Sequence, residues 1–221
     1  MESREQVTME ELLARIDRSN EPFVFPWIHT AVTPSGMRCF SSFAQWREYI
    51  NNLDLLNGVW EPTRARFWRA RRLYLLAWLD YELIKAGELV ALTALEFSLK
   101  ERYAFQILEL RQKTRKKSQL ISLRDVLKHM VEVDGLTNDD IPIAREHRTD
   151  MVGRLYETDD ARKDRKKTSV SEPMTIEGIR NRAAHGDPFD TLPWGALLEV
   201  VRDLIHFADR DRIAPQKSFC R

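Results

Sequence analysis

Four polar side chains suited to chemistry lie within residues 179–186, where they occupy about one and a half turns of an expected helix. His185 suits proton transfer because an imidazole titrates near neutral pH. Arg180 and Arg182 suit a phosphate because a guanidinium stays charged and binds oxyanions through two parallel hydrogen bonds. Asn181, one turn before His185, can hydrogen-bond the imidazole or a substrate. Such residues could cleave RNA without a metal, through attack of the ribose 2′-hydroxyl and a 2′,3′-cyclic phosphate product.

Arg180, Asn181 and His185, with four residues between the arginine and the histidine, resemble the signature of the HEPN superfamily. Many members of that superfamily are metal-independent endoribonucleases, often toxins or phage-defence effectors. The resemblance extends over residues 62–212. It implies a helical bundle that forms a homodimer, with two motif helices facing each other across a cleft. One histidine would then act as base and the other as acid, and Arg180 would stabilise the phosphate.

The two arginines remain alternatives at the phosphate. In a regular helix Arg180 lies about 140° from His185, whereas Arg182 lies about 60° from it. The resemblance therefore points to Arg180, and helical geometry keeps Arg182 as a substrate-binding candidate. An ordinary helix C-terminus would also favour a histidine followed by glycine. Asp187 stands where some HEPN branches carry a tyrosine, which argues against close kinship with those branches.

Glu96 is a second residue that could support the motif. Residues 89–113 have an apolar stripe at helical spacing, and Glu96 falls inside it. A carboxylate in such a stripe needs a partner, because burying it alone is costly. It could pair with a structural arginine or a helix end, or it could face the motif helix and orient Arg180 or His185.

Two basic clusters could hold RNA phosphates, although both could equally be solvated surface. The first begins an expected helix over residues 62–86 and is interleaved with aromatic side chains that could stack on a base. The second lies in the heavily charged stretch 136–172. The candidate RNA-binding residues are Arg64, Arg69, Arg72, Arg165, Lys166 and Lys167.

Composition narrows the class of protein. The 221 residues include 43% hydrophobic residues, enough for a core, and carry a net charge of only +1, so no global field argues for nucleic acid. Cys39 and Cys220 are isolated, which favours a reducing compartment without a disulfide framework. The charged N-terminus and the short apolar runs favour a cytoplasmic protein without a membrane span. No metal-ligand pattern or glycine-rich phosphate loop is present, so we expect no cofactor and no metal.

The scarcity of glycine and the helical periodicity predict an all-α fold. We expect an N-terminal extension that packs on the core, a HEPN-like bundle and a short tail. Their expected bounds are residues 1–61, 62–212 and 213–221. Besides the motif helix, we expect helices over 8–16, 40–56, 62–86, 89–113 and 122–133 and a last one from Pro193, with loops over 20–38 and 136–172. The long charged loop 136–172 precedes the motif helix and would hold at most a short helical piece near residues 151–156.

These features lead to two main functional hypotheses. The first is a HEPN-type endoribonuclease acting on RNA such as tRNA or mRNA, as a toxin or phage-defence effector with an antitoxin or other regulatory partner. The second is a non-catalytic HEPN-like dimer that serves as a binding or regulatory module. A third and weaker hypothesis is an all-α regulator whose basic helix grips DNA.

Overall fold

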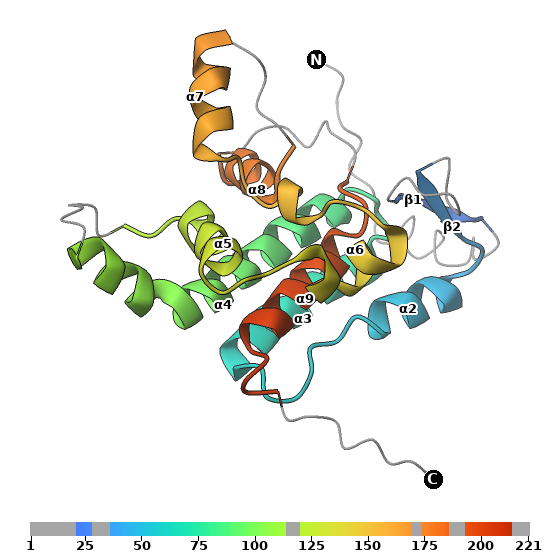
Figure 1. Cartoon of the computed structure of the whole chain (residues 1–221). Coiled ribbons are helices and arrows are strands. Elements are labelled where there is room, and N and C mark those ends of the chain that lie inside the picture. Colours follow the sequence, from blue (N-terminus) through green and yellow to red (C-terminus); the bar gives the residue numbers. More distant parts are fainter. Residues whose placement is uncertain (1–20, 28–35, 114–119, 169–173, 186–192, 214–221) are drawn as a thin grey trace.

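The computed structural model describes residues 21–27, 36–113, 120–168, 174–185 and 193–213. Their fold is mostly helical, as predicted, with one two-stranded antiparallel sheet in the described part of the chain (Figure 1). The sheet pairs β1 (Phe23–Pro26) with β2 (Met37–Phe40). The α-helices are α2 (Phe43–Asn51), α3 (Glu61–Leu76), α4 (Leu83–Lys113), α5 (Leu123–Glu132), α6 (Pro142–His147), α7 (Asp159–Thr168), α8 (Ile176–Ala184) and α9 (Leu197–Ala208). Two short 3-10 helices are η1 (Asn138–Asp140) and η2 (Val152–Arg154).

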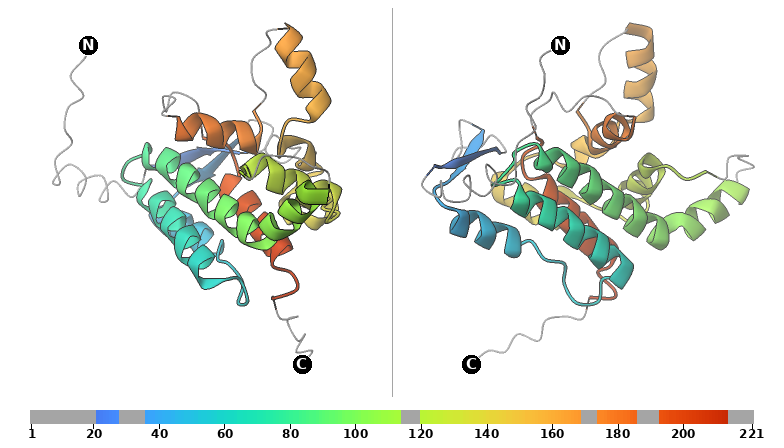
Figure 2. Two further views of the ribbon diagram at one scale, coloured as in Figure 1. Left: turned by 90° about the vertical axis from the view of Figure 1, so that its left-hand side faces the viewer. Right: turned by 180° about the vertical axis from the view of Figure 1, so that it is seen from behind.

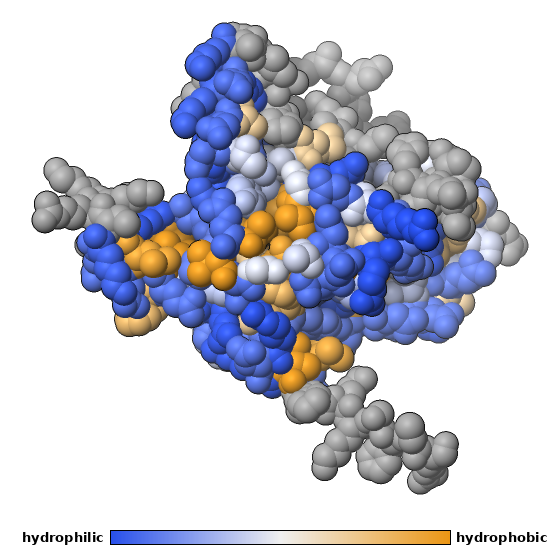
Figure 3. All heavy atoms as spheres, in the orientation of Figure 1, coloured by the Kyte–Doolittle hydropathy of each residue, from blue (hydrophilic) through white to orange (hydrophobic). Residues whose placement is uncertain are grey.

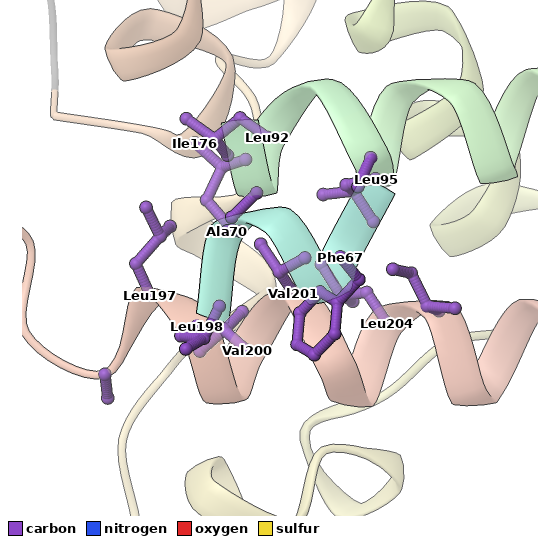
Figure 4. Packing of buried hydrophobic residues seen from close by; sticks show 14 of the residues in the cluster. Phe67, Ala70, Leu92, Leu95, Ile176, Leu197, Leu198, Val200, Val201 and Leu204 are labelled. Atoms are coloured by element: carbon purple, nitrogen blue, oxygen red, sulfur yellow. The ribbon is translucent and has the colours of Figure 1, made fainter. Parts of the chain in front are cut away.

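The core forms where α3, α4 and α9 pack together, and α8 adds one end of its own apolar face (Figures 2 and 4). Each fully buried leucine or phenylalanine here contributes about 2 kcal/mol through loss of apolar surface from water. The residues that meet in this region include Phe67, Ala70, Leu92, Leu95, Ile176, Leu197, Val201 and Leu204. The C-terminal half of α4 extends beyond this core, and Phe105 and Leu110 are exposed there, in a region with hydrophobic surface (Figure 3).

The expected single helix over 62–86 is wrong, because α3 ends at Leu76 and α4 begins at Leu83. Gly87, which falls between the expected helices 62–86 and 89–113, lies inside α4 instead. A Cβ atom at Gly87 would lie 2.6 Å from Cδ2 of the buried Tyr74 on α3. Glycine is therefore placed here for close approach of two helices rather than for a change of direction.

The expected charged loop over 136–172 is also wrong in its main feature, since it contains α6 and α7. Helix α6 begins at Pro142, where a proline is tolerated in the first turn, and it buries Ile143 and Ala144. With only six residues, it is too short to give a clear apolar period. The short helical piece expected near residues 151–156 corresponds to η2.

Helix α7 was not predicted because its residues form no apolar stripe. It begins with Asp159 and Asp160, whose negative charges are favourable at a helix N-terminus. Ion pairs from α5 hold this end, with Arg124 Nη2 2.7 Å from Asp159 Oδ1 and the Lys128 ammonium on the same carboxylate. The pairs come from a distant part of the chain, so local sequence patterns do not reveal them.

Residues 21–27 and 36–60 pack against α3 through an aromatic cluster. Trp46 of α2 has no exposed surface, and its Nε1 donates to the Tyr74 carbonyl oxygen at 2.9 Å. Its ring centroid lies 4.8 Å from that of Phe23 and 4.9 Å from that of Phe40. The sequence predicted a loop over residues 20–38. This prediction is wrong at β1 and at the start of β2, where the chain forms strands. The helix expected over 8–16 lies outside the described residues.

The last helix begins at Leu197, four residues after the expected start at Pro193. The delay follows from Ala196, whose φ of 64° is left-handed and not helical. The preceding Gly195 lies so close to β1 that a Cβ would be 2.6 Å from the Trp27 Cα. The turn before α9 is therefore fixed by contact with the N-terminal hairpin. Asp190 and Thr191, either of which could cap a helix that began at Pro193, lie outside the described residues.

Candidate functional site

Helix α8 holds the motif residues. Thr175 caps its N-terminus, with Oγ1 accepting a hydrogen bond from the Gly178 N–H at 3.0 Å. Ile176 is fully buried and faces the core. The helix ends at Ala184, and the His185 N–H donates to the Asn181 carbonyl oxygen at 3.1 Å as the C-terminal cap. The motif therefore occupies the last turns of a helix, as expected, and the residues 186–188 that should end it lie outside the described part.

Glu96 of α4 faces the motif helix and pairs with Arg180. The Arg180 Nε donates to Glu96 Oε2 at 2.8 Å, and Nη2 lies 2.6 Å from the same oxygen. The other oxygen, Oε1, lies 2.7 Å from Lys100 Nζ. Glu96 is 9% exposed, so two cations compensate for the burial of its charge. The sequence left two alternatives for Glu96: a structural arginine or helix end, or the motif helix. In the structure Glu96 pairs with the motif helix through Arg180.

Asn181 lies beside this ion pair. Its Oδ1 accepts a long hydrogen bond of 3.4 Å from Arg180 Nη1. The Arg180 guanidinium is thus directed toward α4 by Glu96 and contacts Asn181 on its third nitrogen. Its side chain keeps 31% exposure, so part of the guanidinium still reaches solvent.

Arg182 and His185 form the open part of the motif. His185 is exposed and Arg182 is partly exposed. Within the described residues, neither side chain makes a hydrogen bond or ion pair with another residue. Among the described residues nothing therefore competes with a ligand for these two side chains, whereas Glu96 holds Arg180 on the α4 side. The structure thus separates the two arginines that the sequence left as alternatives.

The first basic cluster is not brought to the motif. Arg69 and Arg72 are exposed on α3, and Arg72 lies 4.7 Å from the ring centroid of Trp68, which is 51% exposed. Arg64 pairs with Glu61 at 3.4 Å. Helix α4 lies between α3 and α8 (Figures 1 and 2). These arginines therefore form a separate surface from the one at His185.

The second basic cluster lies on α7, and its charges are partly neutralised. Arg165 binds both carboxylate oxygens of Glu157, at 2.8 and 3.1 Å. Lys167 Nζ lies 3.7 Å from Asp164, with both side chains 76% exposed. The side chain of Lys166 lies outside the described part. Arg165 thus has a structural partner, which weakens its assignment to RNA.

Lys100 and Glu177 are site residues that we did not predict. Lys100 follows Glu96 by four positions, a spacing that favours an ion pair and could have identified it. Glu177 is 8% exposed in the first turn of α8, and its carboxylate lies 3.7 Å from Arg124 Nε. Its N–H also donates to the Leu155 carbonyl oxygen at 3.1 Å. Both ends of α8 are thus anchored, one to α4 and one to α5 and η2.

The described residues hold no group of three or more His, Cys, Asp or Glu that could bind a metal ion. No helix in the described ranges is both long enough and apolar enough to cross a membrane. Comparison of the chain with known protein families, curated proteins and solved structures found no match. The assignment of a function therefore depends on the motif and its geometry.

Replacing Glu96 with alanine is expected to lower the free energy of unfolding by about 2 kcal/mol, because Arg180 and Lys100 would then be left side by side without a carboxylate. Urea unfolding measures the change. The control is Glu109→Ala, which removes an exposed pair with Lys113 and should cost less than about 0.5 kcal/mol. Equal losses in the two variants would show that the Glu96 pair has no special role.

Proposed function

We propose that the protein is a metal-independent endoribonuclease of HEPN type, acting as a toxin or phage-defence effector. The observation that carries the proposal is the end of α8, where an exposed His185 and a partly exposed Arg182 lie free of protein partners among the described residues. Arg180 stands beside them, fixed by Glu96. The resemblance of Arg180, Asn181 and His185 to the HEPN signature supplies the reaction class.

Each side chain has a distinct task in the proposed reaction. His185 takes the proton from a ribose 2′-hydroxyl, and the oxygen attacks the adjacent phosphorus while the bond to the 5′-oxygen breaks. Arg182 stabilises the charge that grows on the phosphate oxygens. Arg180 and Asn181 position the substrate from the α4 side, where Glu96 holds the guanidinium in a fixed orientation. The product carries a 2′,3′-cyclic phosphate.

The reaction also needs an acid to protonate the leaving oxygen. In the proposed homodimer a second copy of α8 supplies this group as its own His185. Ala183 and Ala184 next to the histidine are partly or fully exposed and small, so another helix can come close. RNA, such as tRNA or mRNA, is the proposed substrate, in the cytoplasm and under the control of an antitoxin or other regulatory partner.

The alternative is a non-catalytic HEPN-like dimer that binds or regulates a partner. One observation favours it: Arg180, the arginine that the resemblance makes catalytic, is already neutralised by Glu96. Among the described residues His185 also has no partner that would orient its ring. A binding module would need neither an unpaired Arg180 nor an oriented His185 ring.

The deciding experiment incubates the purified protein with total RNA and with tRNA in EDTA, beside a His185→Ala variant. We expect the wild type to cleave, to leave cyclic phosphate ends, and to spare a DNA strand of the same sequence, because DNA lacks the attacking hydroxyl. The variant should melt at the same temperature, since the exposed His185 contributes little packing, and should lose at least about 100-fold of the cleavage rate.

Two further variants distinguish the arginines. Arg182→Ala should slow cleavage by about 100-fold without a change in melting temperature. Arg180→Ala should lower both the cleavage rate and the melting temperature, because it also breaks the ion pair with Glu96. Equal cleavage by the wild type and His185→Ala would reject the proposed nuclease. Absence of cleavage together with a stable dimer would favour the binding module.

A further inference from the structure

A cavity on the side of the molecule opposite the exposed end of α4 has no part in the proposed nuclease site. It lies where β2, α2, α6 and α9 meet (Figure 1) and has a volume of about 760 Å³. Its lining combines aromatic rings with charged groups. This volume is large enough for a small organic ligand.

One wall of the cavity is an aromatic box that already holds a cation. The Arg38 guanidinium carbon lies 4.7 Å from the ring centroid of Trp27, 4.7 Å from that of Tyr49 and 5.1 Å from that of Phe40. Ring faces attract cations, and three rings around one guanidinium make a strong site of this kind. No hydrogen bond from the Arg38 side chain to another described residue fixes the guanidinium there, so a competing cation could replace it.

The bottom of the cavity carries an incompletely paired acid. Glu199 on α9 is 8% exposed, and its Oε2 has no hydrogen-bond partner within the described structure. The neighbouring Tyr49 hydroxyl lowers the pKa of the same carboxyl group, against the larger and opposite effect of burial. A buried carboxyl with one free oxygen is costly unless a partner arrives.

The remaining charges favour a cationic ligand. Arg202 is neutralised by Asp203, with its Nε 2.8 Å and its Nη2 2.7 Å from the Asp203 Oδ1. The carboxyl groups that line the cavity then outnumber the remaining arginine, Arg38, by three to one. They are Glu48, Glu146 and Glu199. Glu48 and Glu146 are exposed, so they define the rim above the buried Glu199.

We propose that this cavity binds a small organic polycation. One guanidinium or ammonium group of the ligand takes the place of Arg38 in the aromatic box and pairs with Glu199, and a second ammonium group pairs with the rim carboxylates. Arg38 is then a competitor built into the chain, which keeps the box filled until the ligand displaces it.

Calorimetric titration of the full-length protein with agmatine, which carries one guanidinium and one ammonium group, tests this proposal. Arg38→Ala should bind agmatine about tenfold more tightly than the wild type, because the internal competitor is removed. Glu199→Gln should bind about tenfold more weakly. The double variant Glu48→Gln/Glu146→Gln should bind agmatine more weakly than the wild type. Its affinity for methylguanidine, which carries a single charge, should be unchanged.

Proton release gives a readout that a purely structural role would not produce. Burial raises the pKa of Glu199 to about 8, against the opposing effects of Tyr49, Arg202 and Arg38. The other titratable groups around it are Asp203 on α9, Glu146 and His147 on α6, and Glu48 on α2. A bound cation favours the ionised carboxylate, so titration at pH 7 in two buffers should show a proton released by the wild type and none by Glu199→Gln.

The outcomes separate clearly. Tighter binding by Arg38→Ala, together with weaker binding and no proton release by Glu199→Gln, supports the polycation site. Absence of agmatine binding to both the wild type and Arg38→Ala at millimolar concentration overturns it. Equal affinity of the wild type and a correctly folded Glu199→Gln also overturns it.

Discussion

Replacing Glu199 with glutamine is expected to remove a large pH dependence of stability. Burial raises the pKa of Glu199 from 4.5 to about 8, so the folded protein keeps this carboxyl protonated at neutral pH. The unfolded chain ionises it near pH 4.5. Between these two values the unfolded state releases a proton that the folded state retains, and the wild type loses stability as the pH rises.

The size of this loss follows from the shift. Each pH unit in the interval costs about 1.4 kcal/mol, so the whole interval from pH 4.5 to 8 is worth at most about 5 kcal/mol. Glutamine keeps the shape of the side chain but cannot ionise. The difference in unfolding free energy between Glu199→Gln and the wild type should therefore grow in favour of the variant from pH 4.5 to 8 and stay constant above pH 8.

Urea unfolding at a series of pH values measures this difference. Subtracting the wild-type free energy of unfolding from that of the variant cancels the contributions of titratable groups that both proteins share. His206 is such a group: the Leu56 N–H donates to its Nε2 at 3.0 Å, and burial lowers its pKa to about 4. Its neutral form is needed in the fold, so both proteins lose stability as the pH falls from 6.5 to 4. Glu48→Gln, at the exposed rim, is the control. A difference that stays flat across pH 4.5 to 8 would contradict the expectation.

Trp46→Ala is expected to lower the free energy of unfolding by about 4 kcal/mol, because it empties a site without exposed surface and removes the bond to the Tyr74 carbonyl oxygen. Trp46→Phe keeps an aromatic ring but no donor, so it should cost less. The loss should be visible in urea unfolding and in the melting temperature.

Trp68→Ala provides the comparison, since Trp68 is 51% exposed on α3 and its removal should cost about 0.5 kcal/mol or less. If both tryptophan variants lost the same stability, the N-terminal residues would not be part of the cooperative core. Loss of stability in Trp46→Ala alone would show that α2 and the hairpin unfold together with α3.

Elements with strong local signals were predicted closely from the sequence. Helix α5, expected over 122–133, spans Leu123–Glu132. Its capping box joins Ser122 and Asp125, and both residues are visible in the sequence. The apolar stripe of α9 likewise identified that helix, although the start was four residues early because a left-handed Ala196 leaves no signal in composition.

Elements that depend on distant contacts were missed. Helix α7 is held by Arg124 and Lys128 from α5 and has no apolar face of its own. The hairpin strands have four residues each and include a proline, so they resembled a loop. Gly87 could be interpreted only once Tyr74 was seen against it.

The candidate site divides in the same way. The types and spacing of Arg180, Asn181 and His185 identified α8 as the element of interest. Glu96, which is 84 positions away from Arg180 in the chain, pairs with Arg180 and leaves Arg182 without a partner among the described residues. Helical geometry alone predicted the angles of Arg180 and Arg182 relative to His185. It could not predict that Glu96 would pair with Arg180.

The length of α4 has a consequence for hydrogen exchange. Its 31 residues span about 46 Å. The first part packs in the core with α3 and α9, Tyr103 farther along is buried beside His129 of α5, and Leu110 near the end is exposed. Amide protons near Leu92 and Leu95 should exchange only through global unfolding, whereas those near Leu110 should exchange through fraying of the helix end. Glu96 lies in the slow segment. The backbone that fixes Arg180 therefore stays closed for as long as the whole protein remains folded.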